Sequence, residues 1–497
     1  MKTISIIILL ALPLAFVACD SKSGSSVDSG KSAAMEPLDR SKRPDPGPAP
    51  ASSFPDYDTI TTSEGLTLYV IESNRQPTIT YRLMFRSGGL FDGEKTGLAE
   101  FVASMLDQGV AGKSAFELAS EIDFIGASLS ASASSDFIAV SVSGLSKYKE
   151  QLLGILNSVV RAPTFPEEEL EKLKQRTVSN LISERSEPDA LIEKLRRKLV
   201  YGEGGYGAFQ SEESVASITR DDLVAFHRKH FIPNNASMAV VGQIGQEEGV
   251  KLVENRLRGW RKGSAPEQPE LNFPTIGERS VHLLDRSGSV QSTVRVAQQS
   301  VPRSNPDVPE LKVVMSVLGG GFSGRLFQNL REDKGYTYGA GSYTANAAKM
   351  GAIVSYADVR NEVTADAVGE IFNELNRIRE EPIPESELDM HKKYLAGNYM
   401  LSLERPMTIA QNVQEIDVYG LAPDYYQTYV AQLMSVTPEL ALELANKYLH
   451  PRKSLVAIVG KREEVGESLE RFGGVRIYDE KLETQDERDS VSHRETP

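Results

Sequence analysis

The sequence predicts an α+β fold built from two related domains, each a mainly antiparallel sheet covered by helices on one side. Strand-like runs mixed with paired helical segments indicate this class, and an internal duplication indicates that it occurs twice. The composition is that of a globular protein. Of the 497 residues, 40% are hydrophobic and 25% charged, which excludes wholesale disorder and a multi-span membrane protein.

The duplication is visible as a constant offset of 218 residues between matching segments. SITRDDLVAFHRKHFIPNNASMAVVG begins at Ser217, and SVTPELALELANKYLHPRKSLVAIVG begins at Ser435. The same offset relates FPEEEL, ending at Leu170, to IPESEL, ending at Leu388. A single offset held over this distance indicates tandem copies of about two hundred residues each.

The strands are expected where short runs are β-branched, apolar or alternating. SMAVVG and SLVAIVG, each closed by a glycine, have the composition of buried strands. Alternating candidates precede them in the first copy, at residues 67–73, 78–87, 128–134 and 137–143.

The helices are expected where capping residues precede charged, periodic segments. Long helices open after Pro166 and Pro384, and shorter ones follow Thr219 and Thr437, whose hydroxyls suit N-caps. The shorter helices end before a proline in both copies, because the residue preceding a proline is disfavoured in the helical conformation.

The N-terminus predicts export and a lipid anchor. Residues 1–19 have a basic start and a short apolar core, which is typical of a signal peptide. Its end, Phe-Val-Ala-Cys, resembles a bacterial lipobox, and Cys19, the only cysteine, would carry the lipid. Asp20 favours retention on the periplasmic side of the inner membrane. The alternative is a plain signal peptide. Residues 20–56, rich in Ser, Gly and Pro, are expected to be a disordered tether.

The remaining boundaries follow from composition. A polar, Pro-rich linker around 262–278 separates an N-terminal domain at 57–264 from a C-terminal domain at 278–479, and 480–497 form a polar tail. The net charge of −14 argues against a nucleic-acid partner.

Two segments carry a resemblance to a known family. GEKTGLAEFVASMLDQGV at 93–110 and LGGGFSGRLFQNLREDKGYTYGAGSY at 318–343, together with the duplication, resemble the insulinase (pitrilysin-superfamily) metallopeptidases. The class that includes mitochondrial processing peptidase is the most similar, and the resemblance runs from about Thr59 to Tyr478. Active members carry H-x-x-E-H on a helix, with two zinc ligands and a general base.

This chain has lost those groups. The aligned stretch reads Glu100-Phe101-Val102-Ala103-Ser104, so Glu100 and Ser104 replace the histidines and Ala103 replaces the base. The resemblance places the third ligand, a glutamate, at Asn180. Glu100, Ser104 and Asp107 would share a helix face, but oxygen ligands of this kind suit zinc poorly, so a solvated face is the simpler interpretation.

A histidine pair and a glycine-rich loop could each form a binding site. His227 and His230 form an H-x-x-H pair, but they lie near a helix C-terminus without a third ligand, which favours a structural role. The glycine-rich loop before Arg325 lacks the G-K-[ST] ending of a phosphate loop. His282, His391 and the remaining histidines suggest no serine or cysteine partner.

The second copy keeps the residues that handle substrate in the family. Arg331 and Tyr338 match an arginine and a tyrosine that hydrogen-bond the substrate's carbonyls, and Gly319, Gly320 and Gly321 are expected to let a peptide backbone approach.

The resemblance therefore implies a non-catalytic, substrate-binding subunit of a heterodimeric zinc peptidase that cleaves peptides or unfolded chains. The chain itself would hold no cofactor, and zinc would be bound by a partner of similar architecture facing it across an enclosed chamber. The alternative is a cell-envelope scaffold or binding protein with the same fold and no proteolytic role. A third possibility is an independent enzyme with a rebuilt, oxygen-ligand metal site.

Overall fold

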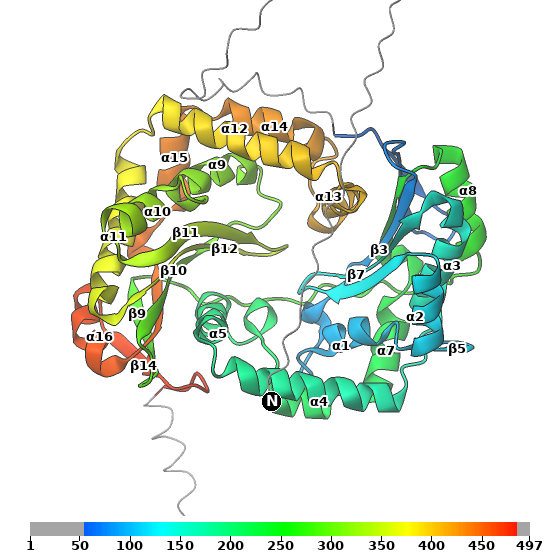
Figure 1. Cartoon of the computed structure of the whole chain (residues 1–497), viewed down its shortest axis with the longest axis horizontal. Helices are drawn as coiled ribbons and strands as arrows, with labels where there is room; N and C mark the ends of the chain where they lie inside the picture. Colours follow the sequence, from blue (N-terminus) through cyan, green and yellow to red (C-terminus); the bar gives the residue numbers. More distant parts are fainter. Residues whose placement is uncertain (1–53, 485–497) are drawn as a thin grey trace, which may run out of the picture. The chain divides into compact units, whose positions relative to one another are not determined.

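The computed structural model describes residues 54–484 and contains two six-stranded sheets (Figure 1). The chain divides into two units, 1–48 and 49–497, and all of the described residues belong to the second. The predicted signal peptide, Cys19 and nearly all of the predicted tether lie outside the described residues. Within 54–484, no helix is long and apolar enough to cross a membrane.

The first sheet has the strand order β1-β2-β8-β3-β7-β6. All neighbours are antiparallel except β2 and β8, which run parallel. The four early strands predicted from alternation are confirmed as β2, β3, β6 and β7, and SMAVVG lies in β8. The bounds are β1 (Asp58–Thr61), β2 (Thr67–Glu72), β3 (Thr78–Phe85), β6 (Ser128–Ala133), β7 (Ile138–Leu145) and β8 (Ala236–Gly242).

The second sheet repeats this topology with the order β11-β12-β10-β13-β9-β14. Its five strands from β11 to β9 correspond one by one to β6, β7, β3, β8 and β2, and the parallel pair β13–β9 corresponds to β8–β2. The bounds are β9 (Ser280–Asp285), β10 (Gln291–Ser300), β11 (Thr337–Asn346), β12 (Gly351–Arg360), β13 (Leu455–Gly460) and β14 (Val475–Tyr478).

The helices of the first half begin where the sequence places them. The long charged helix, α4, follows Pro166, and Thr219 caps α7 by accepting a hydrogen bond from the backbone of Asp222. The bounds are α1 (Leu98–Met105), α2 (Ala115–Phe124), α3 (Lys149–Arg161), α4 (Glu167–Glu184), α5 (Pro188–Tyr201), α6 (Glu212–Ser217), α7 (Arg220–His230) and α8 (Gln246–Leu257).

The helices of the second half match those of the first. Helix α12 follows Pro384 as α4 follows Pro166, and Thr437 caps α15. The bounds are α9 (Val308–Gly319), α10 (Arg325–Phe327), α11 (Thr364–Glu380), α12 (Glu385–Ser402), α13 (Pro406–Tyr419), α14 (Tyr425–Ser435), α15 (Pro438–Tyr448) and α16 (Arg462–Leu469).

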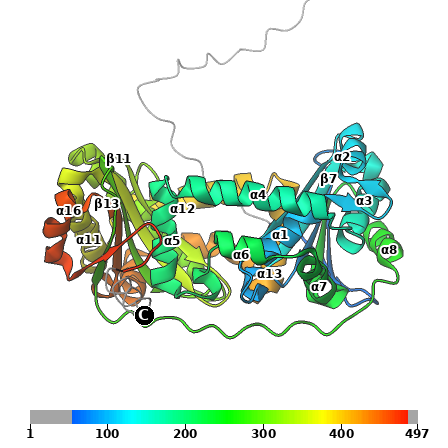
Figure 2. The same cartoon turned by 90° about the horizontal axis from the view of Figure 1, so that it is seen from below.

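The expectation that helices cover each sheet on one side is wrong, because the two halves exchange equivalent helices. Helix α5 of the first half packs on β10 and β13 of the second, and α13 of the second packs on β3 and β8 of the first (Figures 1 and 2). The two helices are related by the same offset that defines the duplication, since α5 spans 188–201 and α13 spans 406–419. Each sheet therefore has a helix from the other half on its second face.

Alternation along the strands separates the resulting cores. In β2, Leu68 and Val70 pack in the core of the first half, whereas Tyr69 and Ile71 pack in the core of the second. Because successive side chains in a strand point to opposite faces, a strand buried on both faces needs apolar residues at every position. This accounts for the apolar run Met238–Val241 in β8, a strand that is buried over its whole length.

Candidate functional site

Helix α1 carries the positions at which active relatives would hold zinc. It begins after Gly97, whose positive φ of 102° suits glycine, and Asp92 accepts hydrogen bonds from the backbone N–H groups of Gly97 and Ala99 at 2.7 and 2.8 Å. The helix contacts β6 and α7. Its apolar residues are fully buried, and they leave one narrow polar face toward solvent.

The four degenerate positions lie as follows. Glu100 is exposed, and its carboxylate accepts a hydrogen bond from the Gln210 amide at 3.0 Å. Ser104 is half-buried, whereas Ala103, at the position of the general base, is only 1% exposed. Asn180 lies exposed on α4. None of these four side chains is a histidine, and a methyl group cannot activate water.

A cavity of about 470 Å³ lies beside α1, and both Glu100 and Glu184 of α4 line it. Although Glu100 is exposed as a whole residue, partial desolvation of its carboxylate in the cavity, and after it the negative charge of Glu184, raises its pKa. Glu184 forms an ion pair with Lys194 of α5 at 2.7 Å. The sequence prediction stopped at Asn180 and missed Glu184, although a residue four positions further along a helix lies on the same face.

The groups around this cavity do not fit zinc. Within residues 54–484, no cluster of three or more His, Cys, Asp or Glu side chains could hold a metal ion. Of the four carboxylates that line it, Glu184 is paired with Lys194 and Glu193 with Arg196, Asp92 accepts from two backbone N–H groups, and Glu100 is bonded to an amide. Zinc sites in proteins are built mainly from histidine and cysteine, with carboxylates as a third partner. No zinc-dependent step can be assigned to this chain's own residues.

The H-x-x-H pair is structural. His227 shares a hydrogen bond of 2.7 Å with the carbonyl oxygen of Val160, and His230 contacts the Ser87 hydroxyl at 2.8 Å. Burial, with a smaller contribution from Lys229, lowers the pKa of His230 to about 4, so the ring is neutral at pH 7. The two imidazoles bind separate partners and do not converge on a common point.

Strand β6 is a free sheet edge next to α1. It pairs with β7 on one side only and closes one end of the strand order. Its sequence, SLSASA, contains none of the lysines or prolines by which edge strands usually avoid pairing with another chain. Its side chains are partly exposed in alternation. An extended peptide could add to this edge through main-chain hydrogen bonds.

Arg331 and Tyr338 are brought together in the second half. The Arg331 guanidinium donates a hydrogen bond of 3.1 Å to the carbonyl oxygen of Tyr338 and lies 4.9 Å above the ring of Phe327. The Tyr338 side chain is 88% exposed. A β-bulge between Thr337 and Ala340 interrupts the pairing of β11 with β12 and holds Tyr338 outward. The Tyr338 side chain is thus free to meet a ligand, whereas the Arg331 guanidinium is already bonded to the Tyr338 carbonyl and pairs with Glu332 at 3.6 Å.

The segment that contains Arg331 is not a regular α-helix. Only Arg325–Phe327 are α-helical, and Gln328–Asp333 form a π-helical turn. Two contacts hold it. Arg325 makes a bidentate ion pair with Glu387 of α12, at 2.8 Å for both bonds, and the Asn329 amide donates to Glu370 and Glu374 of α11. π-Helical turns of this kind are frequent at functional sites.

Two of the three predicted substrate-binding glycines, Gly319 and Gly320, have packing roles. A side chain at Gly319 would lie 2.3 Å from the backbone nitrogen of Ser342 in β11, and one at Gly320 would meet the last turn of α9. Gly321 alone combines a positive φ of 87° with open space around it. The close backbone approach that Gly319 permits is therefore to β11 of the same chain.

Two further histidines, besides His230, have serine partners, contrary to the sequence interpretation. The His391 ring contacts the Ser316 hydroxyl at 2.8 Å, and His282 contacts Ser280 at 2.8 Å. Both rings are buried in the second half, at 0% and 2% exposure. Without access for a substrate, these pairs satisfy buried polar atoms.

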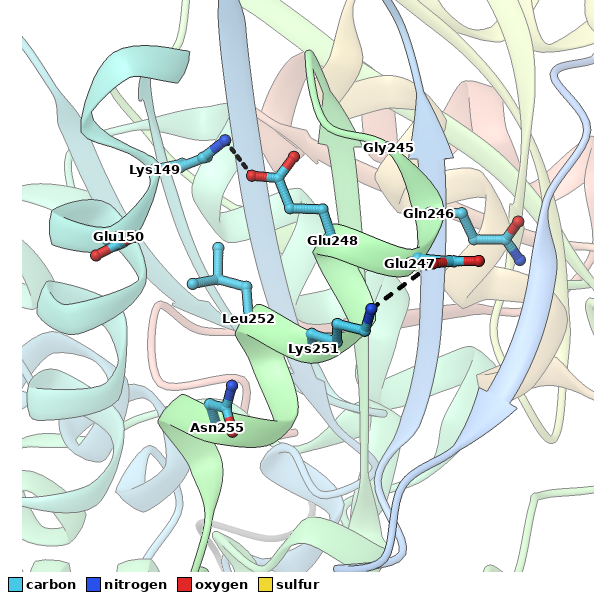
Figure 3. Close-up of a pocket in the computed structure, with 9 residues that line it drawn as sticks. All are labelled: Lys149, Glu150, Gly245, Gln246, Glu247, Glu248, Lys251, Leu252 and Asn255. Atoms are coloured by element: carbon cyan, nitrogen blue, oxygen red, sulfur yellow. Dashed lines mark hydrogen bonds and ion pairs between the residues drawn. The ribbon is translucent and has the colours of Figure 1, made fainter.

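A separate cavity of about 720 Å³ lies at the start of α8 (Figure 3). Its lysines are neutralised, because Lys149 pairs with Glu248 and Lys251 with Glu247. A surface of paired, exposed charges offers no directed group to a ligand.

Comparisons with known proteins are consistent with this geometry. Residues 68–207 match the family described as insulinase (peptidase family M16), and residues 217–395 match that described as peptidase M16 inactive domain. The chain is 28% identical over 316 residues to an uncharacterized zinc protease, YmxG, of Bacillus subtilis, covering 63% of this chain and 75% of that protein. It is 25% identical over 370 residues to a protein of Helicobacter pylori named non-peptidase homolog YmxG, covering 74% and 85%.

Solved structures have the same fold. The crystal structure of a peptidase M16 inactive domain from Pseudomonas fluorescens superposes with a TM-score of 0.77 at 26% identity, covering 82% of this chain and 98% of that one. A protease structure from Helicobacter pylori has a TM-score of 0.77 at 17% identity, covering 82% and 100%. The second likeness concerns the fold alone.

Proposed function

Because the chain belongs to the insulinase (M16) peptidase family, we propose that it is the non-catalytic, substrate-binding subunit of a heterodimeric zinc peptidase acting on peptides or unfolded polypeptides. The observation that carries this proposal is Ala103. A buried methyl group stands at the position of the general base, while the zinc-ligand positions hold Glu100, Ser104 and Asn180. Zinc and the base would come from a partner of similar architecture.

The substrate-binding role rests on groups outside α1. The free edge of β6 offers main-chain donors and acceptors to an extended peptide, and small side chains leave room for it. Arg331 and Tyr338 supply a guanidinium and a phenol, both able to hydrogen-bond an amide carbonyl and to stabilise negative charge on its oxygen. Such donors contribute to catalysis only if the partner's site lies within reach of them.

The exchange of α5 and α13 supports the need for a partner. The two exchanged helices link the halves, because each packs on the sheet of the other half. In α13, the Gln414 side chain donates hydrogen bonds to the backbone carbonyls of Arg82 and Ser237. Moving the halves apart would expose this polar cluster and the apolar strands beneath it, at a large cost. Enclosure of a substrate is therefore assigned to a second chain.

The test compares the chain alone with the chain plus an H-x-x-E-H paralogue from the same organism, using a quenched fluorescent peptide. The isolated chain should not cleave the peptide, and the mixture should. In the complex, Arg331→Ala should lower kcat/KM by about 10–100-fold, as for other lost donors to a developing oxyanion, while size-exclusion chromatography shows intact assembly.

Arg471→Ala is the matched control, because Arg471 is half-exposed and also lies 4.9 Å above a phenylalanine ring, that of Phe472. Its activity should equal that of the unmodified complex. Zinc-dependent cleavage by the isolated chain at a rate similar to the complex would refute the proposal.

The scaffold alternative is favoured by one observation, which is the relative named a non-peptidase homologue. If it holds, no H-x-x-E-H paralogue will co-purify with the chain, and a pull-down from the native envelope will recover other proteins at stoichiometric amounts.

The cellular location is proposed from the sequence. Cys19 would be diacylated and hold the protein at the periplasmic side of the inner membrane without a spanning segment. Mass spectrometry of the mature N-terminus should find a lipidated cysteine, and Cys19→Ser should move the protein from the membrane fraction to the soluble one. An unmodified N-terminus at another residue would contradict the anchor.

A further inference from the structure

A third cavity, of about 640 Å³, is lined by residues of α9, α12, α13 and α14 in the C-terminal half. Figure 1 labels these four helices. It is separate from the cavity beside α1 and shares no lining residue with it. Its walls combine tyrosine rings with a small number of polar groups, a composition typical of sites for small ligands.

One cation in this cavity is already neutralised. The Arg303 guanidinium donates to Glu415 at 3.1 Å, to the Tyr425 hydroxyl at 2.7 Å and to the Tyr426 hydroxyl at 3.2 Å, and it lies 4.8 Å from the Tyr425 ring. Tyr426 in turn donates to Glu415. This network is closed, and it fixes one wall of the cavity.

Lys312 is the second cation that lines this cavity. Its ammonium lies 5.9 Å from the ring of Tyr429 and forms no hydrogen bond or ion pair with any residue in the described range. Although the Lys312 side chain is exposed, partial desolvation by the neighbouring walls, followed by repulsion from Arg303, lowers its pKa, and Glu415 only partly offsets this. An anion in the cavity would relieve the repulsion between the two cations.

Neighbouring elements favour an anion as well. Val308 and Pro309, the first residues of α9, line the same cavity, although the carboxylates of Asp307 and Glu310 partly offset the positive charge of that helix end. The amides of Asn398 and Asn412 also line it and can donate hydrogen bonds. A single free ammonium with neutral donors suits a monoanion such as a carboxylate better than a phosphate dianion.

The rest of the wall is aromatic. Tyr399 and Tyr429 pack their rings 4.8 Å apart, and Tyr394, on the same helix as Tyr399, is 53% exposed at the cavity. Tyrosine rings bind apolar and aromatic groups over a large area at low entropic cost. We propose that this cavity binds a carboxylate joined to an aromatic or apolar body, with Lys312 as its counter-ion. The carboxylate could belong to the C-terminus of a peptide or to a free organic acid.

Isothermal titration of the purified full-length chain at pH 7 tests the site with three probes. These are acetyl-Ala-Ala-Phe with a free C-terminus, the same peptide as its amide, and 3-phenylpropanoate. The free-acid peptide should bind at least about tenfold more tightly than the amide, because only the acid can pair with the ammonium. Saturable binding of 3-phenylpropanoate at equal or higher affinity would identify a free acid as the ligand, and weaker binding would identify a peptide terminus.

Variants separate the site from general effects. Lys312→Met should weaken the acid by about tenfold, whereas Lys312→Arg should retain most of the affinity and show that the charge is what matters. Lys147→Met is the matched control, because Lys147 also lies over a tyrosine ring, that of Tyr148 at 4.8 Å. Thermal unfolding of each variant checks that it is folded. No saturable binding of either acid, or equal affinity for Lys312→Met and the unmodified chain, would overturn the proposal.

This site is independent of the proposed role in proteolysis. Carboxylate binding by a chain that forms no active complex with an H-x-x-E-H paralogue would support the cavity assignment and refute the subunit role. An active complex formed by a chain that does not bind the carboxylate would support the subunit role and refute the cavity assignment.

Discussion

The side-chain amide of Gln414, in α13, donates a hydrogen bond of 3.0 Å to the carbonyl oxygen of Arg82 in β3, while its own oxygen accepts from the Arg82 guanidinium. The two residues come from different halves of the duplicated chain, and both are buried. This pair joins the exchanged helix to the sheet that it covers. It also gives the backbone carbonyl of Arg82 a hydrogen-bond partner that an apolar side chain at position 414 could not supply.

Removing Gln414 should therefore destabilise the whole described region. Gln414→Ala leaves the Arg82 guanidinium and the Ser237 carbonyl without their partner, which should cost about 2–4 kcal/mol of unfolding free energy. Urea unfolding followed by circular dichroism measures it. Gln411→Ala, on the exposed side of the same helix, should change stability by less than about 0.5 kcal/mol. Equal midpoints for the two variants would show that the exchange does not depend on this contact.

Zinc should have no effect on the unmodified chain. Ligands that bind only the folded state raise the melting temperature, so zinc addition or chelation should leave Tm unchanged. The double variant Glu100→His, Ser104→His places two imidazoles four residues apart on α1, near the carboxylate of Glu184, and should gain a zinc-dependent rise in Tm.

Glu100→His alone is the control for the zinc experiment, because one imidazole is too few ligands for tight binding. Metal analysis after dialysis should find about one zinc per chain only in the double variant. Stoichiometric zinc in the unmodified protein would contradict the assignment of α1 as inert.

Local rules predicted much of this fold, and non-local contacts account for what they missed. The bounds of α4 and the caps at Thr219 and Thr437 follow from residues adjacent in sequence. The exchange of α5 and α13 does not, because an amphipathic pattern shows that a helix face is buried without showing which sheet buries it.

The same limit applies to the site. Loss of the zinc motif could be read from five consecutive residues. The approach of Glu184 to Glu100 depends on how α4 crosses α1. The helical segment that contains Arg331 is held by Glu387 and Glu370, which come from other helices. Neither contact can be predicted from the residues adjacent in sequence.

The ion pair beneath that turn should be important for stability. The Arg325 side chain is 6% exposed and Glu387 24%. Glu387→Ala would leave a buried guanidinium without its carboxylate, at a cost of about 3–5 kcal/mol. Glu387→Gln keeps one acceptor and should cost less. Glu381→Gln removes only an exposed pair with Arg377 and should cost under about 0.5 kcal/mol. Thermal unfolding ranks the three, and a Glu387→Ala variant as stable as Glu381→Gln would exclude a structural role for this pair.

Asp92 should make stability depend on pH in a window that its own protonation defines. Burial raises the pKa of Asp92 to about 6, opposed by the N–H groups of Ala99 and Gly97 and aided by the charge of Glu100. The unfolded chain has an ordinary aspartate with a pKa near 4. Between about pH 4 and pH 6 the folded state therefore binds more protons than the unfolded state, and stability from this group falls as the pH rises.

Comparison with Asp92→Asn isolates this contribution from other titrating groups. The unfolding free energy of the unmodified chain, relative to that of the variant, should fall on the order of 1–3 kcal/mol from pH 4 to pH 6 and then stay level. Glu100→Gln removes the neighbouring negative charge, so it should move the midpoint of that fall to lower pH. Parallel curves for Asp92→Asn and the unmodified chain across the window would show that Asp92 titrates alike in the folded and unfolded states, and that the start of α1 is not the acid-sensitive element.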